Sequence, residues 1–350
     1  MKQLCLFIFF CLSVSLSFGR EKDTPQKGEG IYSFLRRHNR TEPKQYDEFI
    51  RLNKNKLGKS NSLLQGTVYF LPPLKVTTSQ KKEKINEKKE KINEKSKMGI
   101  QPLLGTQPLF GEKYKSYEIK DNKLAGACFY LVSGHGGPDP GAIAKVDGQE
   151  LHEAEYAYDI MLRLARCLLE HNATVQIIIQ NPTLGIRDDK YLTNSRNQTC
   201  MGKEISSVQV ARLKQQSNEI NRINFKTKNK YQRAIFIHLD SRSKNKRLDV
   251  FFYYQNGKQN KAPSLKLAET MQKTFRNLYD KYQPDRGFSG TVSTRPLYVL
   301  RNTTPVSLFV ELANMQNAND QKRFMSGNSR QVLANWLCAG FINDYQSTSH

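Results

Sequence analysis

The sequence has few cysteines for its length. Its 350 residues contain six, and Cys5 and Cys11 lie within the first nineteen. No pair among the other four has the short spacing that is typical of a metal site. An even number permits two disulfides in an oxidising compartment, although small buried thiols are an equal alternative for those in apolar runs. The sequence therefore leaves the pairing of these four open: Cys128, Cys167, Cys200 and Cys338.

Long apolar runs are absent after the first nineteen residues. That opening segment, MKQLCLFIFFCLSVSLSFG, has an early lysine, an apolar middle and small residues at its end. This pattern predicts a cleavable export signal over residues 1–19. Its apolar block is shorter than the roughly 20 residues that a spanning helix needs. We therefore expect an exported protein, periplasmic or secreted, with no transmembrane segment after signal removal.

Acidic residues are scarce relative to basic ones. Lys and Arg number 55 against 32 Asp and Glu, which gives a net charge of +23. Such a balance favours anionic partners. Nucleic acid is not expected, because part of the lysine lies in a spacer and no recognition motif accompanies it. For an exported chain, a cell-wall polymer rich in carboxylates is the natural partner.

A charged repeat divides the chain. The unit KKEKINE occurs twice between residues 81 and 94, and each copy has one apolar residue. It offers no stripe wide enough to bury, so we expect a solvated linker over residues 75–112.

The segment before this linker, residues 28–74, has two helical stripes and ends in the short strand VYFLP. It resembles a LysM module, a class that binds glycans containing N-acetylglucosamine. A small helical cap is the alternative interpretation. The residues that carry the resemblance are Gly28, Ile31, Leu52, Asn53, Gly66 and Pro72.

From residue 125 onward, short apolar strands alternate with amphipathic helices. This alternation predicts an α/β domain with a mostly parallel sheet flanked by helices. The predicted helices cover 153–170, 208–224, 264–282 and 329–341. The predicted strands cover 127–132, 173–179, 234–238, 249–254, 296–300 and 306–312.

Four ionisable residues fall where these strands end. His135 follows the first strand in the loop SGHGGPDPGA, His238 closes AIFIH, and Glu311 closes VSLFVE. Glu153 begins the helix after the His135 loop. Since functional groups gather beyond the carboxyl ends of strands in such sheets, we expect all four at one edge.

Two histidines and a carboxylate form a recurring ligand set for catalytic zinc. We therefore predict that His135, Glu153 and His238 bind Zn²⁺ and that Glu311 is the general base. The histidines and Glu153 each also have a structural explanation, and Glu153 would suit a helix start. A glutamate at the end of a buried strand, such as Glu311, is harder to explain by structure alone, because unpaired buried carboxylates are costly. The coincidence of all four favours the site.

The ordered motifs LVSGHGGPDPGA, EAEYAYDIMLRL, AIFIHLDS and VSLFVELANMQNANDQ resemble the zinc-dependent N-acetylmuramoyl-L-alanine amidases of type 3 over residues 125–345. The resemblance implies a peptidoglycan hydrolase that cleaves the amide between N-acetylmuramic acid and L-alanine. By position, His135, Glu153 and His238 match the metal ligands and Glu311 the catalytic glutamate. Glu150 and Glu155 are rivals for the second ligand.

The chain departs from that family beside the ligands, which leaves substrate detail open. Candidate substrate-binding residues are Asp240, Asn314 and Arg187. The polar segment 181–207 is a surface loop or, alternatively, a lid over the metal. A non-catalytic cell-wall binding protein and a zinc peptidase acting on stem peptides are the other functional hypotheses, and the need for a protein activator stays open.

Overall fold

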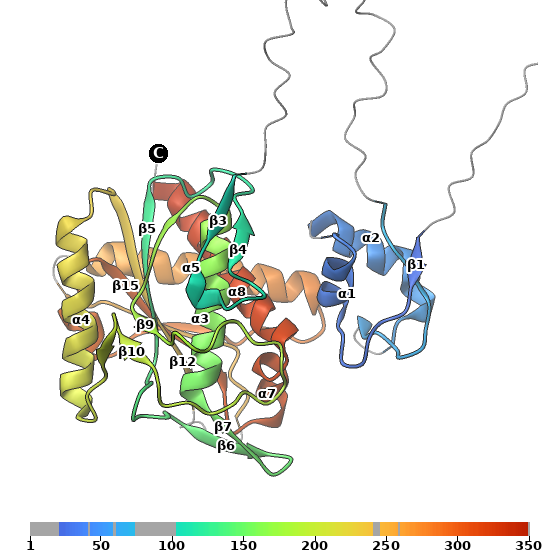
Figure 1. Ribbon diagram of the computed structural model, residues 1–350. Coiled ribbons are helices and arrows are strands. Elements are labelled where there is room, and N and C mark those ends of the chain that lie inside the picture. The colour runs from blue at the N-terminus through green and yellow to red at the C-terminus, as the bar shows by residue number, and fades with distance from the viewer. Residues whose placement is uncertain are drawn as a thin grey trace, which may run out of the picture. The chain divides into compact units, whose positions relative to one another are not determined.

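The computed structural model describes residues 21–40, 43–58, 61–73, 103–240, 246–257 and 260–348 (Figure 1). These residues belong to two compact units, Met1–Lys95 and Ser96–His350. The predicted export signal and most of the predicted linker lie outside the described residues. Within the described ranges, no helix is both long enough and apolar enough to cross a membrane.

The first unit has the element order β-α-α-β. Strand β1 (Lys22–Asp23) pairs antiparallel with β2 (Tyr69–Phe70), and α1 (Ile31–Arg37), α2 (Pro43–Asn53) and the 3₁₀ turn η1 (Lys54–Lys56) lie between them in sequence. Its core contains most of the apolar residues of the two predicted stripes, with Phe34 and Phe49 fully buried, whereas Leu52 lies outside it. Asn53 is also buried, and its side-chain amide donates to the carbonyls of Phe49 and Phe70.

The second unit is built on a six-stranded sheet in the order β14-β13-β15-β12-β5-β8. All neighbouring strands are parallel except β13 and β15. The α/β prediction with a mostly parallel sheet is confirmed. Strand β5 is buried at every residue, as expected of a strand covered on both faces. The bounds are β5 (Ala127–Ser133), β8 (Thr174–Ile177), β12 (Tyr231–Asp240), β13 (Phe251–Tyr254), β14 (Thr291–Thr294) and β15 (Val306–Asn314).

Helices cover both sides of this sheet (Figure 1). Helix α3 (Glu153–Glu170) packs against α8 (Gly327–Thr348), which in turn packs against α5 (Lys261–Tyr282). Helix α4 (Gln209–Lys226) lies on the opposite side and contacts the short helix α6 (Tyr298–Asn302). Helix α7 (Ala318–Phe324) leads into α8. The strand predicted over 296–300 is wrong, because most of it belongs to α6.

The reason for that error is physical. Only Val299 and Leu300 of the apolar run PLYVL are fully buried, and they are adjacent rather than alternating. So short a run does not distinguish a strand from a helical turn by periodicity. The single strand predicted over 173–179 is likewise divided, into β8 and β9 (Ile179–Gln180).

The second unit also contains three small sheets outside the six-stranded one. Strand β9 joins β10 (Thr199–Cys200) and β11 (Lys203–Glu204) in a three-stranded sheet. Strands β6 (Ile143–Val146) and β7 (Gln149–His152) form a hairpin directly before α3, and β3 (Leu104–Thr106) pairs with β4 (Ser116–Glu118) around the turn η3 (Pro108–Phe110).

A buried ion cluster holds α3 in place at its middle. Asp159 Oδ2 lies 2.7 Å from Arg163 Nε and 2.5 Å from Arg330 Nε of α8. The other oxygen, Asp159 Oδ1, accepts from the backbone N–H of Arg187 at 2.7 Å. Although burial raises it, the two guanidinium groups hold the pKa of Asp159 below its usual range. Helix α3 is therefore tied both to α8 and to the segment that follows β9.

Candidate active site

The four predicted site residues meet at the carboxyl edge of the sheet. His238 of β12 is the register partner of Glu311 in the adjacent strand β15. On the other side of β12, the backbone N–H of Gly134 donates to Ile237 O at 2.7 Å, so the loop carrying His135 begins beside His238. Glu153 enters from the first residue of α3. The structure thus brings together side chains from four separate segments.

Glu153 is the centre of this group. Its Oε2 lies 3.1 Å from His135 Nε2, and its Oε1 lies 2.9 Å from His238 Nδ1. The backbone N–H groups of Ala142 and Leu239 donate to the same carboxylate, at 2.9 and 3.1 Å. These bonds fix the orientation of a side chain that is only 4 % exposed.

The backbone of the His135 loop is tightly constrained. His135 itself has φ +63°, a left-handed conformation that non-glycine residues rarely adopt and that often marks a functional site. Gly141 has φ +71°, and a Cβ there would lie 2.7 Å from both Glu153 Oε2 and a ring carbon of His135. A Cβ at Gly134 would lie 2.1 Å from the His238 ring. Two of the loop glycines are therefore required by close approach to the site itself.

Further residues orient the two imidazoles. The Nδ1 of His135 lies 2.8 Å from Asp139 Oδ2, and Asp139 also pairs with Arg212 of α4. His238 stacks on Phe309 with ring centroids 4.3 Å apart. The contact of Asp139 with His135 is a feature that only the folded loop shows. Arg212 lies in the helix predicted over 208–224, and nothing in the sequence indicated its ion pair with Asp139.

The charges of the group depend strongly on one another. Burial lowers the pKa of His135, but Glu153 and Asp139 outweigh that effect and raise it to about 10. Burial lowers the pKa of His238. Glu153 is buried, yet the two histidines hold the pKa of its carboxyl far below its usual range. An anionic carboxylate between two imidazoles is thus the favoured state.

Glu311 has the opposite environment. Its side chain is 8 % exposed, and Oε2 has no hydrogen-bond partner among the described residues. Burial, with the nearby charges of Glu153 and Asp240, raises the pKa of Glu311 well above its usual value. A buried carboxyl oxygen without a partner is costly unless something else binds it or it takes part in proton transfer.

This donor set fits a zinc ion. One donor atom from each of His135, Glu153 and His238 lies within 4.8 Å of the other two. The second ring nitrogen of His135 bonds to a carboxylate, an arrangement that fixes the ring of metal-binding histidines. Neither rival is better placed for the second ligand. Glu150 is exposed on β7 beside Lys145, and Glu155 is engaged by Arg187, the backbone N–H of Ser195 and Gln198.

The four residues open into a cavity of about 240 Å³. Its walls come from α4, from α6 and the chain before it, and from the ends of β12 and β15. Asp240 and Arg295 also line it. Neither Arg187 nor Asn314, both expected to bind substrate, is among the lining residues. Arg187 instead pairs with Glu155 at 2.9 Å, and the Asn314 amide donates to Lys246 O.

The segment 181–207 likewise contributes no lining residue to the cavity. It contacts the back of the His135 loop, where the backbone N–H of Gly137 donates to Gln198 Oε1 at 3.0 Å. Glu155 holds it to the start of α3. The segment therefore supports the loop from outside the cavity and does not cover the four site residues.

Arg295 lines the same cavity, although no motif in the sequence marks it. It follows β14 immediately, and its guanidinium lies over the ring of Tyr253, 5.1 Å from the centroid. It also lines a larger depression, of about 660 Å³, together with Arg301. Arg295 thus lines both the cavity of the four site residues and this depression.

The chain belongs to the N-acetylmuramoyl-L-alanine amidase family, because a model of that family matches residues 130–343. The chain is also similar to an uncharacterized cell wall amidase of Bacillus anthracis, with 27 % identity over 66 % of this chain and 38 % of the relative. It therefore spans well under half the length of that protein.

Similar solved structures include two from Clostridium difficile. The N-acetylmuramoyl-L-alanine amidase of Clostridium difficile 630 has a TM-score of 0.46 and 19 % identity over 65 % of this chain and 99 % of that one. Cwp6 from Clostridium difficile has a TM-score of 0.45 and 19 % identity over 62 % of this chain and 29 % of that one.

Proposed function

We propose that this chain is an exported, zinc-dependent peptidoglycan hydrolase that cleaves the amide between the lactyl group of N-acetylmuramic acid and L-alanine. The observation that carries the proposal is the meeting of His135, Glu153, His238 and Glu311 around one cavity. Family membership supports the amide bond as the target.

In this proposal His135, Glu153 and His238 hold the ion. Zinc supplies polarisation of the amide carbonyl and a lowered pKa for the attacking water. Asp139 accepts a hydrogen bond from Nδ1–H of His135, so Nε2, which faces Glu153, is the ring nitrogen that would bind the ion in place of its proton. The Asp139–Arg212 pair in turn prevents the loop from swinging outward.

Glu311 performs the proton transfers. Its free carboxylate oxygen accepts the proton of the water as the water attacks the carbonyl carbon. The same group then donates this proton to the nitrogen of L-alanine as the C–N bond breaks. Burial raises the pKa of the Glu311 carboxyl above its usual value, which is the direction that helps a carboxylate to accept a proton before returning it.

Arg295 is our candidate for substrate recognition, in place of Arg187 and Asn314. Stem peptides carry carboxylates, and Arg295 lies at the border of the cavity and the adjoining depression. A guanidinium binds a carboxylate through two parallel hydrogen bonds, which fixes both position and orientation. Asp240 stays a candidate because it lines the same cavity.

The N-terminal unit, expected as a LysM-like module over residues 28–74, would hold the enzyme on glycan. Its first strand, β1, begins at Lys22 and therefore before the expected bound. Its β-α-α-β order and the left-handed conformation of Gly28 and Gly66 support this assignment. So does the structural use of Asn53, whose amide joins the end of α2 to β2. The solvated linker expected over 75–112 must end before β3, because Phe110 is buried in the core of the second unit. A linker shortened in this way would still let the module and the catalytic domain, expected over 125–345, bind separate parts of the polymer.

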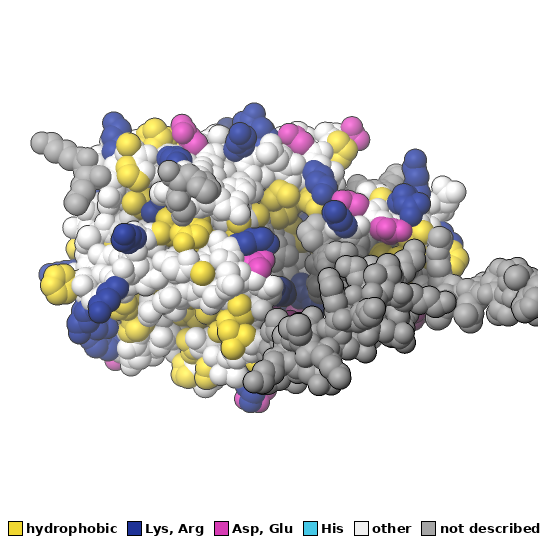
Figure 2. All heavy atoms as spheres, turned by 90° about the horizontal axis from the view of Figure 1, so that it is seen from above, with side chains coloured by type: hydrophobic (Ala, Val, Ile, Leu, Met, Phe, Trp, Pro, Cys, Tyr) yellow, Lys and Arg dark blue, Asp and Glu magenta, His cyan; other side chains and the backbone are white. Residues whose placement is uncertain are grey.

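The basic charge would add retention on cell-wall carboxylates at low ionic strength. On the face seen in Figure 2, Lys and Arg side chains are scattered in small groups and form no continuous stripe. This distribution fits diffuse attraction better than a shaped site for one rigid polyanion.

The test is digestion of purified peptidoglycan by the full chain, with zinc and with a chelator. Mass analysis should find intact stem peptides with a free L-alanine amino group, formed only when zinc is present. Cleavage within the stem peptide would instead indicate a peptidase. Zinc-loaded protein that binds the polymer without releasing peptides would indicate a non-catalytic binding protein.

A further inference from the structure

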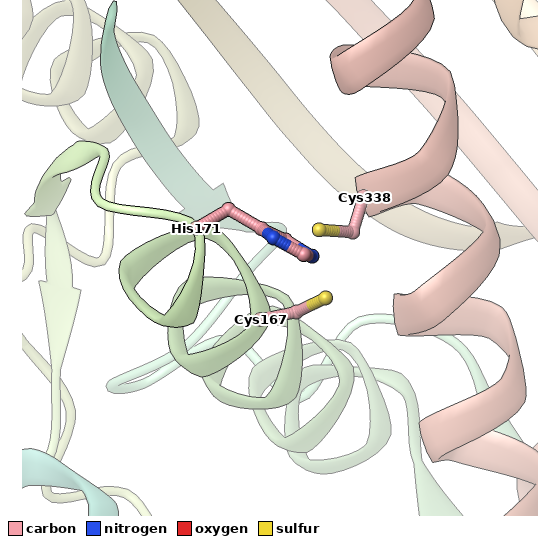
Figure 3. A group of neighbouring side chains, drawn as sticks. All are labelled: Cys167, His171 and Cys338. Atoms are coloured by element: carbon pink, nitrogen blue, oxygen red, sulfur yellow. The ribbon is translucent and has the colours of Figure 1, made fainter. Parts of the chain in front are cut away.

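A second group of metal-binding side chains lies at the far end of α3. Cys167 belongs to the last turn of α3, His171 is its C-terminal cap, and Cys338 lies in α8 (Figure 3). One donor atom from each residue lies within 4.8 Å of the other two. At about 1.5 Å rise per residue, Cys167 is about 21 Å along the helix from Glu153, so this group is separate from the active site.

The geometry points to a second metal site: we propose that Cys167, His171 and Cys338 bind a thiophilic divalent cation, with Zn²⁺ as the natural occupant. Thiolate sulfur and imidazole nitrogen are the ligands that zinc prefers. The proposal does not depend on the function proposed for the other end of α3.

The orientation of His171 supports a metal over a simple thiol pair. Its Nδ1 lies 2.8 Å from Asp121 Oδ1, which leaves Nε2 directed toward the two sulfurs (Figure 3). This is the carboxylate–histidine arrangement that fixes the ring of metal-binding histidines. A disulfide between Cys167 and Cys338 would need no histidine, and no carboxylate behind it.

The end of α3 is also held rigidly in this position. The backbone N–H of Leu124 donates to His171 O at 2.9 Å, and that of Lys120 donates to Glu170 O at 2.7 Å. Cys167 and His171 are four residues apart on a helix, so their side chains share one face. That face is turned toward α8, which packs along α3.

The fit in distance is close. Zinc–sulfur bonds of about 2.3 Å and zinc–nitrogen bonds of about 2.0 Å place tetrahedral ligand atoms roughly 3.5 to 3.8 Å apart. The donor atoms of Cys167, His171 and Cys338 lie within 4.8 Å of one another, so binding an ion would bring them together by about an ångström at most.

The ion would join the C-terminal end of α3 to the middle of α8. It has three protein ligands, and His171 is 17 % exposed, so water can complete the fourth position. Because binding favours the folded state, zinc at about 100 times Kd should raise the melting temperature by roughly 5 to 10 °C.

Cobalt gives a readout that the active site does not share. Thiolate–cobalt charge-transfer absorption requires sulfur ligands, and His135, Glu153 and His238 supply none. The full chain, stripped with a chelator and kept reduced, should develop this band on titration with Co²⁺. Zinc should abolish it in a one-to-one ratio. Absence of the band in reduced wild-type protein would overturn the proposal.

Variants locate the site. His171→Asn keeps a donor for Asp121 at the Nδ1 position and removes Nε2, and Cys338→Ser removes one sulfur. Each should bind Co²⁺ at least about 100-fold more weakly, whereas Cys200→Ala, which removes a buried cysteine outside the group, should bind as wild type. Unchanged affinity in His171→Asn would contradict the assignment.

A disulfide between Cys167 and Cys338 is the alternative to a metal site, and it can be tested on the same protein. Alkylation before reduction, followed by mass analysis, reports whether Cys167 and Cys338 are joined in freshly purified wild-type chain. Free thiols protected from alkylation by added zinc support the metal site. A cross-linked pair that takes up no metal until reduced would overturn it and indicate a disulfide instead.

Discussion

The substitution Glu311→Gln separates proton transfer from metal binding. Oε2 of Glu311 has no hydrogen-bond partner among the described residues, so replacing an oxygen by an amide group there breaks no bond. The raised pKa of the buried carboxyl also means that a neutral side chain of the same shape suits this environment. We therefore expect the variant to fold with a melting temperature no lower than that of wild type.

The expected loss of rate in Glu311→Gln follows from the role of Glu311 as a general base. Loss of a positioned general base typically costs about 100- to 10,000-fold in rate, which corresponds to roughly 2.7 to 5.4 kcal/mol of transition-state stabilisation. Glu311 does not belong to the group of donor atoms that gathers around Glu153. Zinc content should accordingly stay at the wild-type value while kcat falls by that factor.

The assay is release of soluble stem peptides from purified peptidoglycan, with zinc measured on the same samples. Glu150→Gln is the matched control, because this carboxylate is exposed on β7 and pairs with a lysine. Retention of more than about a tenth of wild-type activity by Glu311→Gln would refute the assignment of the base. Loss of zinc in the variant would instead show that Glu311 is a ligand.

Three further perturbations test other parts of the molecule. Gly141→Ala should lose zinc and activity while remaining folded, because its Cβ would lie 2.7 Å from Glu153 Oε2; metal analysis and circular dichroism check this. Asp159→Asn should lower stability by about 3 to 5 kcal/mol, because it leaves the buried Arg330 without an anionic partner and Arg163 with Asp188 alone. Since the folded-state pKa of Asp159 is depressed, its contribution is present above about pH 4 and is lost as pH falls toward the folded value, so thermal melts of variant and wild type should converge in acid. Arg295→Gln should raise KM for peptidoglycan about tenfold or more with a smaller change in kcat, and an unchanged KM would remove it from substrate binding.

The sequence predicted the active-site group because its members are marked by position along the strands. His135, His238 and Glu311 each follow or close an apolar run, and parallel strands place such ends at one edge. The bounds of α3 were predicted as observed, since its apolar spacing is long and regular. What the sequence could not give was the backbone strain at His135, which only the closed loop reveals.

The misses have equally specific causes. The run at 296–300 was too short for its periodicity to separate strand from helix, and Arg295 beside it carries no motif. The group of Cys167, His171 and Cys338 was not predicted, because the usual sequence signal for a metal site is a pair of closely spaced cysteines. Here one helix supplies a cysteine and a histidine four residues apart, and the second cysteine arrives from the opposite end of the domain.

Helix α3 connects these observations. It presents Glu153 at its first residue, Asp159 to two arginines near its middle, and Cys167 at its last turn. A buried ion pair contributes little net stability compared with apolar packing, so its value at Asp159 lies in fixing where the helix sits. Because Glu153 contacts both histidines within 3.1 Å, a shift of α3 along its axis by even one ångström would separate the donor atoms. We infer that the precision of the catalytic site is set along the whole length of this helix, which explains why charged and metal-binding side chains occur at depths where apolar residues would stabilise the fold equally well.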